Sequence, residues 1–371
     1  MNTHLHIVCF DVPYPPDYGG VVDLFYKIKY LHDAGVKIHL HCFEYGRGRQ
    51  EVLKQFCEEV HYYPRKKMVF PFLPFIVASR MNRVLKNRLL ADSYPILLEG
   101  VHCSFYLFKG DLPADRCWVR LHNVEWKYYA NLARSSGAFL KSLYFLWESW
   151  MLKRYEGKLA AKGKFLCLSR EDIEVYQSMG AERVEYLPVF VEGGGKVFSE
   201  EGRGDYCLYH GNLSVPENEK VVTFLVQEVF AHLQVKFVVA GKNPSIRLMA
   251  LCRNHHVECI ANPSETELNN LIREAQVNVL PSVNNTGIKV KIINALSKGR
   301  FVMTNKEGVD KAGSWKALCI VADHAAEWRE SVSSTMEKHF TLEDIARRQE
   351  VLSGEFSAVA NTQRLISFIF S

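Results

Sequence analysis

The stretch PSVNNTGIKVKIINALSKG, residues 281–299, is the most informative part of this sequence for the fold. An apolar run over 277–280 precedes it, a polar loop follows that run, and an apolar helical pattern begins near Gly287. The order of strand, loop and helix is typical of a parallel α/β sheet. N–H groups at the helix start and two lysines, Lys289 and Lys291, would converge on a bound diphosphate. The alternative interpretation is a surface helix with a basic face.

Short apolar runs alternate with amphipathic stretches on both sides of this motif, which predicts βαβ units throughout the chain. Upstream strands are expected at 5–10, 37–43, 96–99, 117–121 and 164–168. The same rhythm restarts later, with strands expected at 206–211, 235–240, 257–260, 277–280 and 301–304. We therefore predict an α/β protein with two Rossmann-like, doubly wound domains that face each other across a cleft. Such sheets bind ligands at the carboxyl ends of their strands.

A glycine-rich segment separates the two halves. Residues 192–205 read EGGGKVFSEEGRGD and hold five glycines among charged residues without an apolar period, as a flexible connection does. We predict an N-terminal domain over 1–191, a linker over 192–205, a C-terminal domain over 206–355 and a last helix over 356–371.

The composition is that of an ordinary folded protein. Of 371 residues, 48% are hydrophobic and 23% are charged, which excludes global disorder and a fibrous repeat and suggests two domains. A net charge of +5, from 46 basic and 41 acidic residues, is too small to indicate nucleic-acid binding. The ten cysteines are scattered and form no CxxC pair, so we expect reduced, buried thiols in a cytoplasmic protein. Disulfides and a zinc site are not expected.

No segment has the pattern of a signal peptide or a membrane span. The first ten residues lack a basic region followed by a long apolar core. The longest apolar stretch, 68–78, contains two prolines and is far shorter than the roughly 20 residues that a spanning helix needs.

Two loops in the first half carry candidate residues. PPDYGG, residues 15–20, lies between the first strand and the first helix, and Gly19 and Gly20 would let the backbone approach an anionic ligand. Two glycines that simply form a turn are the alternative, and the GxGxxG dinucleotide fingerprint is missing. At a later strand end, His122 is placed to hydrogen-bond a substrate hydroxyl or to act as a base. Alternatively, Asn123 caps the next helix and His122 fills space.

Two segments combine basic and aromatic residues. Residues 65–88 carry seven basic side chains around an apolar patch, and Phe70, Phe72 and Phe75 would dip into an anionic membrane interface. The alternative is that the apolar part packs in the N-terminal domain while the charges are solvated. The stretch FLKSLYFLWESWMLKRY, residues 139–155, has helical spacing and is predicted to be a long core helix.

Histidines alternate on two predicted strands. His4 and His6 share one face of the first strand, and His39 and His41 share one face of the second. Because no thiolate or carboxylate stands at ligand spacing, we expect no metal site there.

Several motifs, taken in order, resemble a known enzyme family. They are PPDYGG, RLHNVEWKYY, YLPVF, YHGNLSVPENEK, VVAGKNPS, AQVNVLPS and NTGIKVKIINALSKGRFVMTN, and they span nearly the whole chain. Their order is similar to that in glycosyltransferases of the GT-B fold, which have two Rossmann-like domains. The resemblance is specifically to family four, the glycosyl transferases group 1 of bacterial polysaccharide pathways.

The resemblance implies a donor site in the C-terminal domain and an acceptor site in the N-terminal domain. The nucleoside diphosphate sugar would lie against residues at strand ends and at one helix start: Gly211, Asn212, Gly241, Lys242, Thr286, Gly287, Ile288, Lys289, Lys291 and Asn294. Gly19 and Gly20 would lie close to the donor phosphates, and His122 close to the transferred sugar. The last helix would cross back onto the first domain.

The resemblance also implies a mechanism. The family needs no essential metal or cofactor, and it normally retains the anomeric configuration, with the leaving phosphate assisting the attack. Thr286 and Asn294 stand where the family commonly has two glutamates about two helical turns apart. Neutral side chains can still hydrogen-bond sugar hydroxyls. This departure bears on donor identity and on activity.

We therefore expect a cytoplasmic glycosyltransferase, peripheral on the inner face of the membrane. It would move a sugar from a nucleoside diphosphate sugar to a glycan or lipid-linked acceptor in bacterial surface polysaccharide assembly. The alternatives are a nucleotide-sugar epimerase or hydrolase on the same fold, and a non-catalytic protein that binds nucleotide sugars. No nucleic-acid partner is expected.

Overall fold

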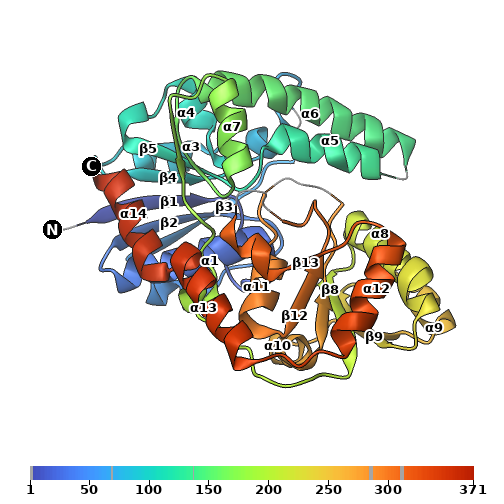
Figure 1. Cartoon of the computed structure of the whole chain (residues 1–371). Helices are drawn as coiled ribbons and strands as arrows, with labels where there is room; N and C mark the ends of the chain where they lie inside the picture. The colour runs from blue at the N-terminus through green and yellow to red at the C-terminus, as the bar shows by residue number, and fades with distance from the viewer. Residues whose placement is uncertain (1–2, 68–69, 137, 284–286, 310–312) are drawn as a thin grey trace. The chain divides into compact units, whose positions relative to one another are not determined.

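Two separate parallel sheets organise the chain, each flanked by helices (Figure 1). The computed structural model describes residues 3–67, 70–136, 138–283, 287–309 and 313–371. It divides into two compact units. Unit 1 holds Met1–Glu192, Thr286–Ile288 and Ala358–Ser371, and unit 2 holds Gly193–Asn285 and Lys289–Ser357. The prediction of an α/β fold with two doubly wound sheets is confirmed.

The sheet of unit 1 has seven parallel strands in the order β3-β2-β1-β4-β5-β6-β7. Their bounds are β1 (His4–Cys9), β2 (Lys37–Glu44), β3 (Glu59–Pro64), β4 (Ile96–Glu99), β5 (Cys117–Leu121), β6 (Lys164–Cys167) and β7 (Arg183–Tyr186). Successive residues of a strand point to opposite faces, so β5 sends Trp118 into one core and Val119 into the other. Both faces of the sheet are therefore covered.

Helices supply the outer layers of unit 1. One core contains side chains of α1 (Gly19–Asp33) and α14 (Ala358–Phe370). The other contains side chains of α2 (Phe75–Ala78), α3 (Arg83–Leu89), α4 (Phe105–Lys109), α6 (Phe139–Ala160) and α7 (Arg170–Ser178). Helix α5 (Glu125–Ser135) lies alongside α6 (Figure 1). Because Leu365 and Ile369 of α14 join the same core as Leu5 of β1, the two ends of the chain complete one unit.

The sheet of unit 2 has six parallel strands in the order β10-β9-β8-β11-β12-β13. Their bounds are β8 (Tyr206–Asn212), β9 (Lys236–Lys242), β10 (Glu258–Ala261), β11 (Val277–Val279), β12 (Phe301–Thr304) and β13 (Ile320–Val321). The helices are α8 (Pro216–Phe224), α9 (Ile246–Asn254), α10 (Glu265–Glu274), α11 (Val290–Lys298), α12 (Ala325–Met336) and α13 (Leu342–Phe356).

The glycine-rich segment that we predicted as a flexible linker is bonded to unit 2 over much of its length. Gly202 exchanges two backbone hydrogen bonds of 2.9 Å with Phe340. The Gly204 N–H donates to Gln276 Oε1 at 2.8 Å, and a Cβ at this position would lie 2.3 Å from the Glu274 carbonyl oxygen. Glycine at position 204 therefore permits close packing rather than flexibility.

The stretch 139–155 forms a helix as expected, but the prediction that it lies in the core is wrong for its first half. The C-terminal half of α6 is buried through Leu152, Tyr155 and Leu159. In the N-terminal half, Phe139 is 77% exposed and Leu140 is 80% exposed. Helical spacing of apolar residues was the only signal available, and that signal does not tell a buried face from an uncovered one.

Candidate active site

Each sheet reverses its strand order at one point, and ligands of such folds bind outside the carboxyl ends of the strands at that point. In unit 1 the reversal lies between β1 and β4, and in unit 2 it lies between β8 and β11. Most of the candidate residues predicted from sequence lie at the carboxyl end of a strand or in the segment that follows it. Each unit has its own set of candidate residues, and we call each set a half-site.

A fully buried ionic network underlies the half-site of unit 1. Lys27 Nζ of α1 lies 2.8 Å from Asp23 Oδ2 and 2.8 Å from Glu99 Oε1 at the end of β4. Arg120 of β5 donates from Nη2 to Asp23 Oδ1 at 3.0 Å and to the Pro188 carbonyl at 2.9 Å. Two carboxylates and two cations balance, so the network is neutral as a set, which is what permits its burial.

The network also bears on metal binding. Asp23, Glu99 and His122 offer ligand atoms within 4.8 Å of one another, which is close enough to hold a cation. The Lys27 ammonium already contacts both carboxylates, however. Burial raises the pKa of Asp23, but Arg120 and Lys27 together lower it by more. The pKa therefore lies below its usual value, and the carboxylate stays ionised. The positive charge that these two acids need is supplied by the chain itself.

His122, the predicted catalytic residue, follows β5 and is only 7% exposed. Its Nε2 lies 3.0 Å from Glu99 Oε2, so the carboxylate accepts the Nε2 proton and orients the ring. The other ring nitrogen, Nδ1, is buried and has no hydrogen-bond partner among the described residues. Phe10, just after β1, packs edge-on against the ring at 5.2 Å between centroids. A substrate hydroxyl could donate to the lone pair that this tautomer leaves on Nδ1.

The alternative in which Asn123 caps the helix is wrong. Helix α5 begins at Glu125, so its N-cap residue is Val124 and not Asn123. The Val124 side chain makes no capping hydrogen bond. Glu156 of α6 takes this role instead, because its carboxylate accepts the N–H groups of Glu125 and Trp126 at 3.1 and 2.9 Å. Burial, followed by the nearby Glu156, raises the pKa of Glu125 to about 8. Sequence spacing held no signal for this pairing across 31 residues.

Gly19 and Gly20 begin α1, as predicted, and both are half-buried. A Cβ on Gly20 would lie 3.0 Å from the Phe10 ring, so the loop packs closely against the end of β1. Tyr18 donates its hydroxyl to Asp11 Oδ2 at 2.9 Å and thereby fixes the loop. The glycines therefore lie at the edge of the sheet where the half-site was expected.

Arg80 belongs to this edge and not to the membrane-facing group in which the sequence analysis included it. It is 6% exposed, and it donates to the Phe10 carbonyl at 2.9 Å and to the Ile76 carbonyl at 2.7 Å. Burial lowers its pKa to about 10, so it remains a cation at neutral pH. Its backbone contact with the end of β1 places a buried positive charge near the half-site.

The half-site of unit 2 is built around the start of α11. The helix begins at Val290 and not near Gly287, and Lys289 occupies the residue before it. Gly287 and Ile288, just before this helix, belong to unit 1 and not to unit 2. Gly287 has φ of +60°, a conformation that glycine adopts readily, and Ile288 is half-buried. Thr286 lies outside the described residues.

Lys291 is the most perturbed cation of this half-site. Burial, followed by Lys289, lowers its pKa to about 7, and Glu217 offsets this only partly. Its Nζ lies 3.4 Å from Tyr209 Oη and 4.8 Å from the centre of that ring. Asn294 is half-buried one turn further along α11. Burial disfavours the charged form of this lysine. A bound anion would raise the pKa again and keep the side chain protonated, so the position suits an anionic ligand.

Backbone at the ends of β8 and β9 forms the other wall. A Cβ on Gly241 would lie 1.9 Å from the Gly211 carbonyl oxygen, so only glycine lets the two strands approach this closely. Asn212 accepts hydrogen bonds from the Ser214 N–H at 3.1 Å and from its hydroxyl at 2.7 Å. The Lys242 carbonyl accepts the Leu213 N–H at 2.9 Å. These contacts order the loops that follow both strands.

His210 of β8 was not among the candidate residues predicted from the sequence. It is 4% exposed, and its Nε2 is buried without a hydrogen-bond partner in the described part of the chain. Burial lowers its pKa to about 3, with further contributions from Lys291 and Lys298. A histidine inside the run YCLYHGN reads as part of an apolar strand, so its closeness to α11 could not be predicted.

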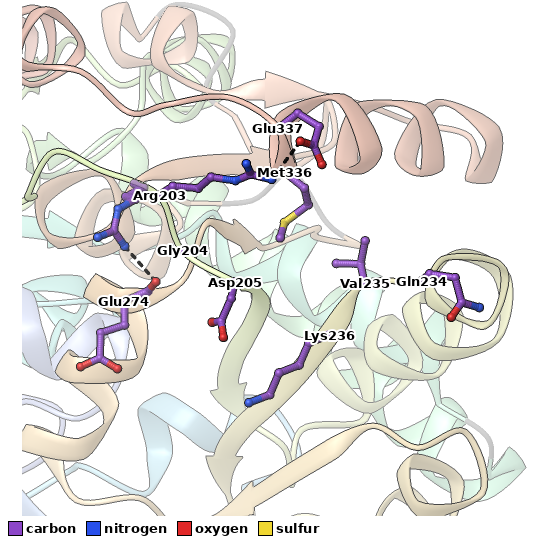
Figure 2. Close-up of a pocket in the computed structure, with 10 residues that line it drawn as sticks. Arg203, Gly204, Asp205, Gln234, Val235, Lys236, Glu274, Met336 and Glu337 are labelled. Carbon is purple, nitrogen blue, oxygen red and sulfur yellow. Dashed lines mark hydrogen bonds and ion pairs between the residues drawn. The ribbon is translucent and has the colours of Figure 1, made fainter.

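A pocket of about 700 Å³ in unit 2 lies at the opposite edge of the same sheet (Figure 2). Its lining includes Asp205, which precedes β8, and Lys236, which begins β9. Arg203 and Glu337 form an ion pair of 2.9 Å across it. Because it borders the amino ends of the strands, this pocket is separate from the half-site.

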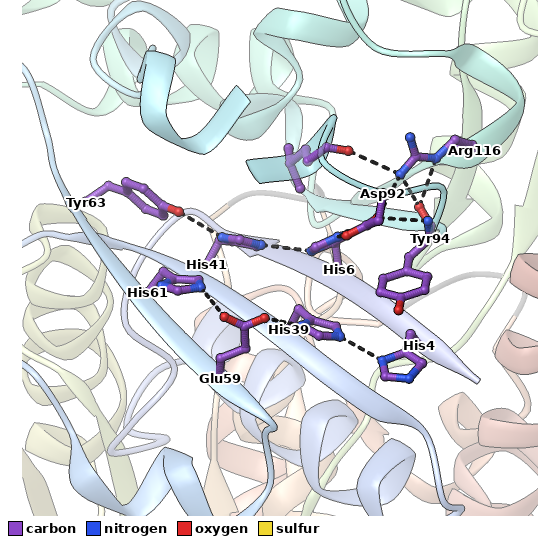
Figure 3. Close-up of polar contacts among 11 residues, drawn as sticks. His4, His6, His39, His41, Glu59, His61, Tyr63, Asp92, Tyr94 and Arg116 are labelled. Carbon is purple, nitrogen blue, oxygen red and sulfur yellow. Dashed lines mark hydrogen bonds and ion pairs between the residues drawn. The ribbon is translucent and has the colours of Figure 1, made fainter. Parts of the chain in front are cut away.

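The histidines of β1, β2 and β3 form a hydrogen-bonded ladder (Figure 3). His6 Nδ1 lies 3.0 Å from His41 Nε2, and His41 Nδ1 lies 2.9 Å from Tyr63 Oη. Asp92 accepts from His6 Nε2 at 3.0 Å. Burial lowers the pKa of both His6 and His41, so these rings stay neutral and join strands rather than carry charge.

Comparisons with known proteins found similar sequences and similar folds. Residues 204–338 match the model of a family described as glycosyl transferases group 1. An uncharacterized 44.6 kDa protein in the cps region of Klebsiella pneumoniae is 23% identical over 330 residues, covering 83% of this chain and 84% of that protein.

Solved structures with similar folds cover the whole chain. HepE of Anabaena, in complex with UDP and glucose, has a TM-score of 0.67 at 12% identity, with 100% of both chains covered. TarM of S. aureus, in complex with UDP among other ligands, has a TM-score of 0.62 at 11% identity, again with 100% of both chains covered. The UDP-forming α,α-trehalose-phosphate synthase of Burkholderia vietnamiensis has a TM-score of 0.63 at 11% identity, with 100% of this chain and 97% of that chain covered. At these identities the likeness shows a shared fold alone.

Proposed function

We propose that this chain is a glycosyltransferase of the glycosyl transferases group 1 family, whose model residues 204–338 match, and that it moves a sugar from a nucleoside diphosphate sugar to a glycan or lipid-linked acceptor. The location of the Klebsiella relative in a cps region supports a role in bacterial surface polysaccharide assembly. Ten free cysteines, seven of them buried, support a cytoplasmic location.

The observation that carries this proposal is the position of Lys289 and Lys291 at the start of α11, where burial also lowers the pKa of Lys291 to about 7. A diphosphate is the kind of ligand that restores the charge of a desolvated lysine, and the N–H groups of a helix start favour it as well. HepE and TarM were each solved with UDP, which supports a uridine diphosphate donor as the first choice.

The chemistry needs stabilisation of the leaving group more than it needs a nucleophile from the protein. The bond between C1 of the sugar and the diphosphate oxygen breaks, and its electron pair leaves with the diphosphate. The acceptor hydroxyl oxygen bonds to C1, and its proton passes to the departing phosphate, with retention of configuration. Lys289 and Lys291 would neutralise the charge that develops on the diphosphate. No metal is required in this scheme, because lysines supply the positive charge.

We assign His122 a positioning role toward a substrate hydroxyl. Glu99 holds its Nε2 proton, and the Nδ1 lone pair would accept the hydroxyl proton as a hydrogen bond. His122→Ala should therefore lower turnover by roughly 10–100-fold and leave UDP affinity unchanged. Lys27 still pairs with Glu99 in this variant, so the network stays neutral. Unchanged turnover would remove this role from His122.

The donor site is tested by the rise in melting temperature with UDP, UDP-sugars and GDP-sugars. One nucleotide should stabilise selectively, and Lys291→Met should weaken its binding by about tenfold or more because a charge-assisted contact is lost. Lys236→Met, at the other edge of the same sheet, is the matched control and should bind normally.

Product analysis separates the alternatives. A transferase consumes the donor only when an acceptor is present, whereas an epimerase or hydrolase acts on the donor alone. Nucleotide binding without turnover on any acceptor would favour a non-catalytic binding protein. No stabilisation by any nucleotide in a folded sample would overturn the proposed function.

A further inference from the structure

The first half of α6 exposes an unusual group of large apolar side chains. We call this group the α6 surface; it consists of Phe139, Leu140, Leu143, Tyr144, Leu146, Trp147 and Trp150. Trp147 is 54% exposed and Leu140 is 80% exposed. A helix that is apolar on all sides is normally buried, and contiguous exposed apolar patches mark interaction sites.

The charges on the α5–α6 hairpin are sorted by sign. Its three acidic residues are Glu125, Glu148 and Glu156, and all are at most 4% exposed. The basic residues of the hairpin are half-buried or exposed: Lys127, Arg134, Lys141, Lys153, Arg154 and Lys158. The charged side chains that the hairpin exposes are therefore all basic, and no exposed acid of the hairpin offsets them.

Glu148 also joins a second segment to this surface. Its carboxylate accepts the Phe75 N–H at 2.9 Å and so fixes the start of α2 against α6. Phe72, three residues earlier, is 88% exposed, and Lys66 and Lys67 are exposed as well. Part of the predicted membrane segment 65–88 thus lies beside α6, while Ile76, Val77 and Ala78 pack into the core of unit 1.

We propose that the α6 surface, together with Phe72, inserts into the interface of an anionic lipid bilayer. Aromatic and aliphatic side chains would enter the boundary between headgroups and acyl chains, and the surrounding lysines and arginines would meet lipid phosphates. Trp147 and Trp150 are the residue type that prefers this boundary. The helix would lie on the membrane, because none of the described helices is long and apolar enough to cross one.

Charge favours lipid over a second copy of this chain. Two α6 surfaces that faced each other would bring two sets of cations together without intervening acids, and like charges disfavour such a contact. An anionic bilayer complements both the charge and the apolar side chains. Membrane docking goes beyond the proposed transfer reaction, and it would hold the enzyme where a lipid-linked acceptor resides.

The test is co-sedimentation of the full chain with vesicles, without donor or acceptor. The wild type should bind phosphatidylcholine vesicles that contain phosphatidylglycerol, bind pure phosphatidylcholine weakly, and lose affinity as salt rises. Leu140→Ser with Trp147→Ser should lower the partition coefficient by about tenfold or more. Lys141→Glu with Arg154→Glu should reduce binding to the vesicles that contain phosphatidylglycerol and leave the weak binding to pure phosphatidylcholine unchanged.

A matched control changes equally exposed apolar residues of unit 2. Ile246 is 84% exposed and Leu342 is 65% exposed, so Ile246→Ser with Leu342→Ser should bind like the wild type. Thermal melting checks that every variant is folded. The proposal is overturned if the wild type does not bind anionic vesicles, or if the α6 variant binds as well as the control. It is also overturned if α6 instead mediates a concentration-dependent dimer that leaves vesicles unbound. Because the assay uses no nucleotide, its failure leaves the transferase proposal standing.

Discussion

At the scale of single residues, the two half-sites differ in whether a buried lysine is paired with carboxylates. In unit 1, Lys27 meets Asp23 and Glu99, and the buried cation is matched inside the protein. In unit 2, Lys291 is desolvated beside Lys289 and is left with a pKa of about 7. The first arrangement is neutral by itself, whereas the second would be neutralised by the anionic ligand that we propose.

The charge of Lys291 predicts a pH dependence of nucleotide binding. Bound diphosphate should raise the pKa of Lys291 from about 7 toward its usual 10.5, so the complex binds one more proton than the free protein between these values. UDP affinity should therefore fall by up to about tenfold for each pH unit above 7. Calorimetry in buffers of different ionisation enthalpy measures the proton uptake. Lys291→Met should abolish it, and uptake that persists in this variant would point to another group.

At the scale of elements, close approach of backbone decides how the strand ends of unit 2 are built. The Gly241 Cα lies so near the Gly211 carbonyl that a side chain has no room between β8 and β9. The loops that follow these strands border the site that we propose for the donor. Glycine at position 241 therefore permits close packing of the two strands. Gly157 of α6, by contrast, has open space where a Cβ would lie.

This contrast predicts opposite effects for two glycine substitutions. Gly241→Ala should push the ends of β8 and β9 apart, lower the free energy of unfolding by about 1–3 kcal/mol and weaken nucleotide binding. Gly157→Ala lies in a helix with nothing within 4 Å of the new Cβ and should raise stability by about 0.5–1 kcal/mol. Denaturant unfolding compares the two. Equal stability of Gly241→Ala and the wild type would contradict the packing argument.

At the scale of the whole molecule, unit 1 is assembled from both ends of the chain. Leu365 and Ile369 of α14 pack in the core that also holds Leu5 and Trp118. Unit 1 therefore cannot complete its core until the last residues are present, although more than 150 residues of unit 2 intervene. The contact is long-range in sequence and local in space.

Leu365→Ala tests this closure of unit 1. Leu365 is fully buried, so the substitution should lower the free energy of unfolding by about 2–5 kcal/mol through lost burial and a cavity. Val359→Ala on the same helix is 69% exposed in the wild type and should be nearly neutral. UDP affinity should stay unchanged in both variants, because α14 lies in unit 1 whereas Lys289 and Lys291 lie in unit 2. A neutral Leu365→Ala would show that α14 is dispensable for the core.

Much of the architecture could be predicted from local patterns. Runs such as 117–121 and 206–211 are mostly apolar, and each is followed by a helical pattern, which is enough to indicate parallel strands between helices. Gly19, Gly241, Lys289 and Lys291 were predicted as candidates because the segments after strand ends carry the ligand-binding residues of such folds, and their role in binding stays a prediction. In each case the chemical signal lies within a few neighbouring residues.

The sequence by itself determined the α/β class, the two sheets, and the loops that carry the candidate residues, because periodicity and turn residues act over short distances. Only the tertiary structure decided which partners the buried charged side chains contact. Glu99 contacts Lys27 and His122, Glu156 accepts backbone N–H groups at the start of α5, and Arg80 donates to the backbone at the end of β1. It also decided that half of α6 lacks a covering layer. Burial and charge pairing depend on residues far apart in the chain, so no local pattern can encode them.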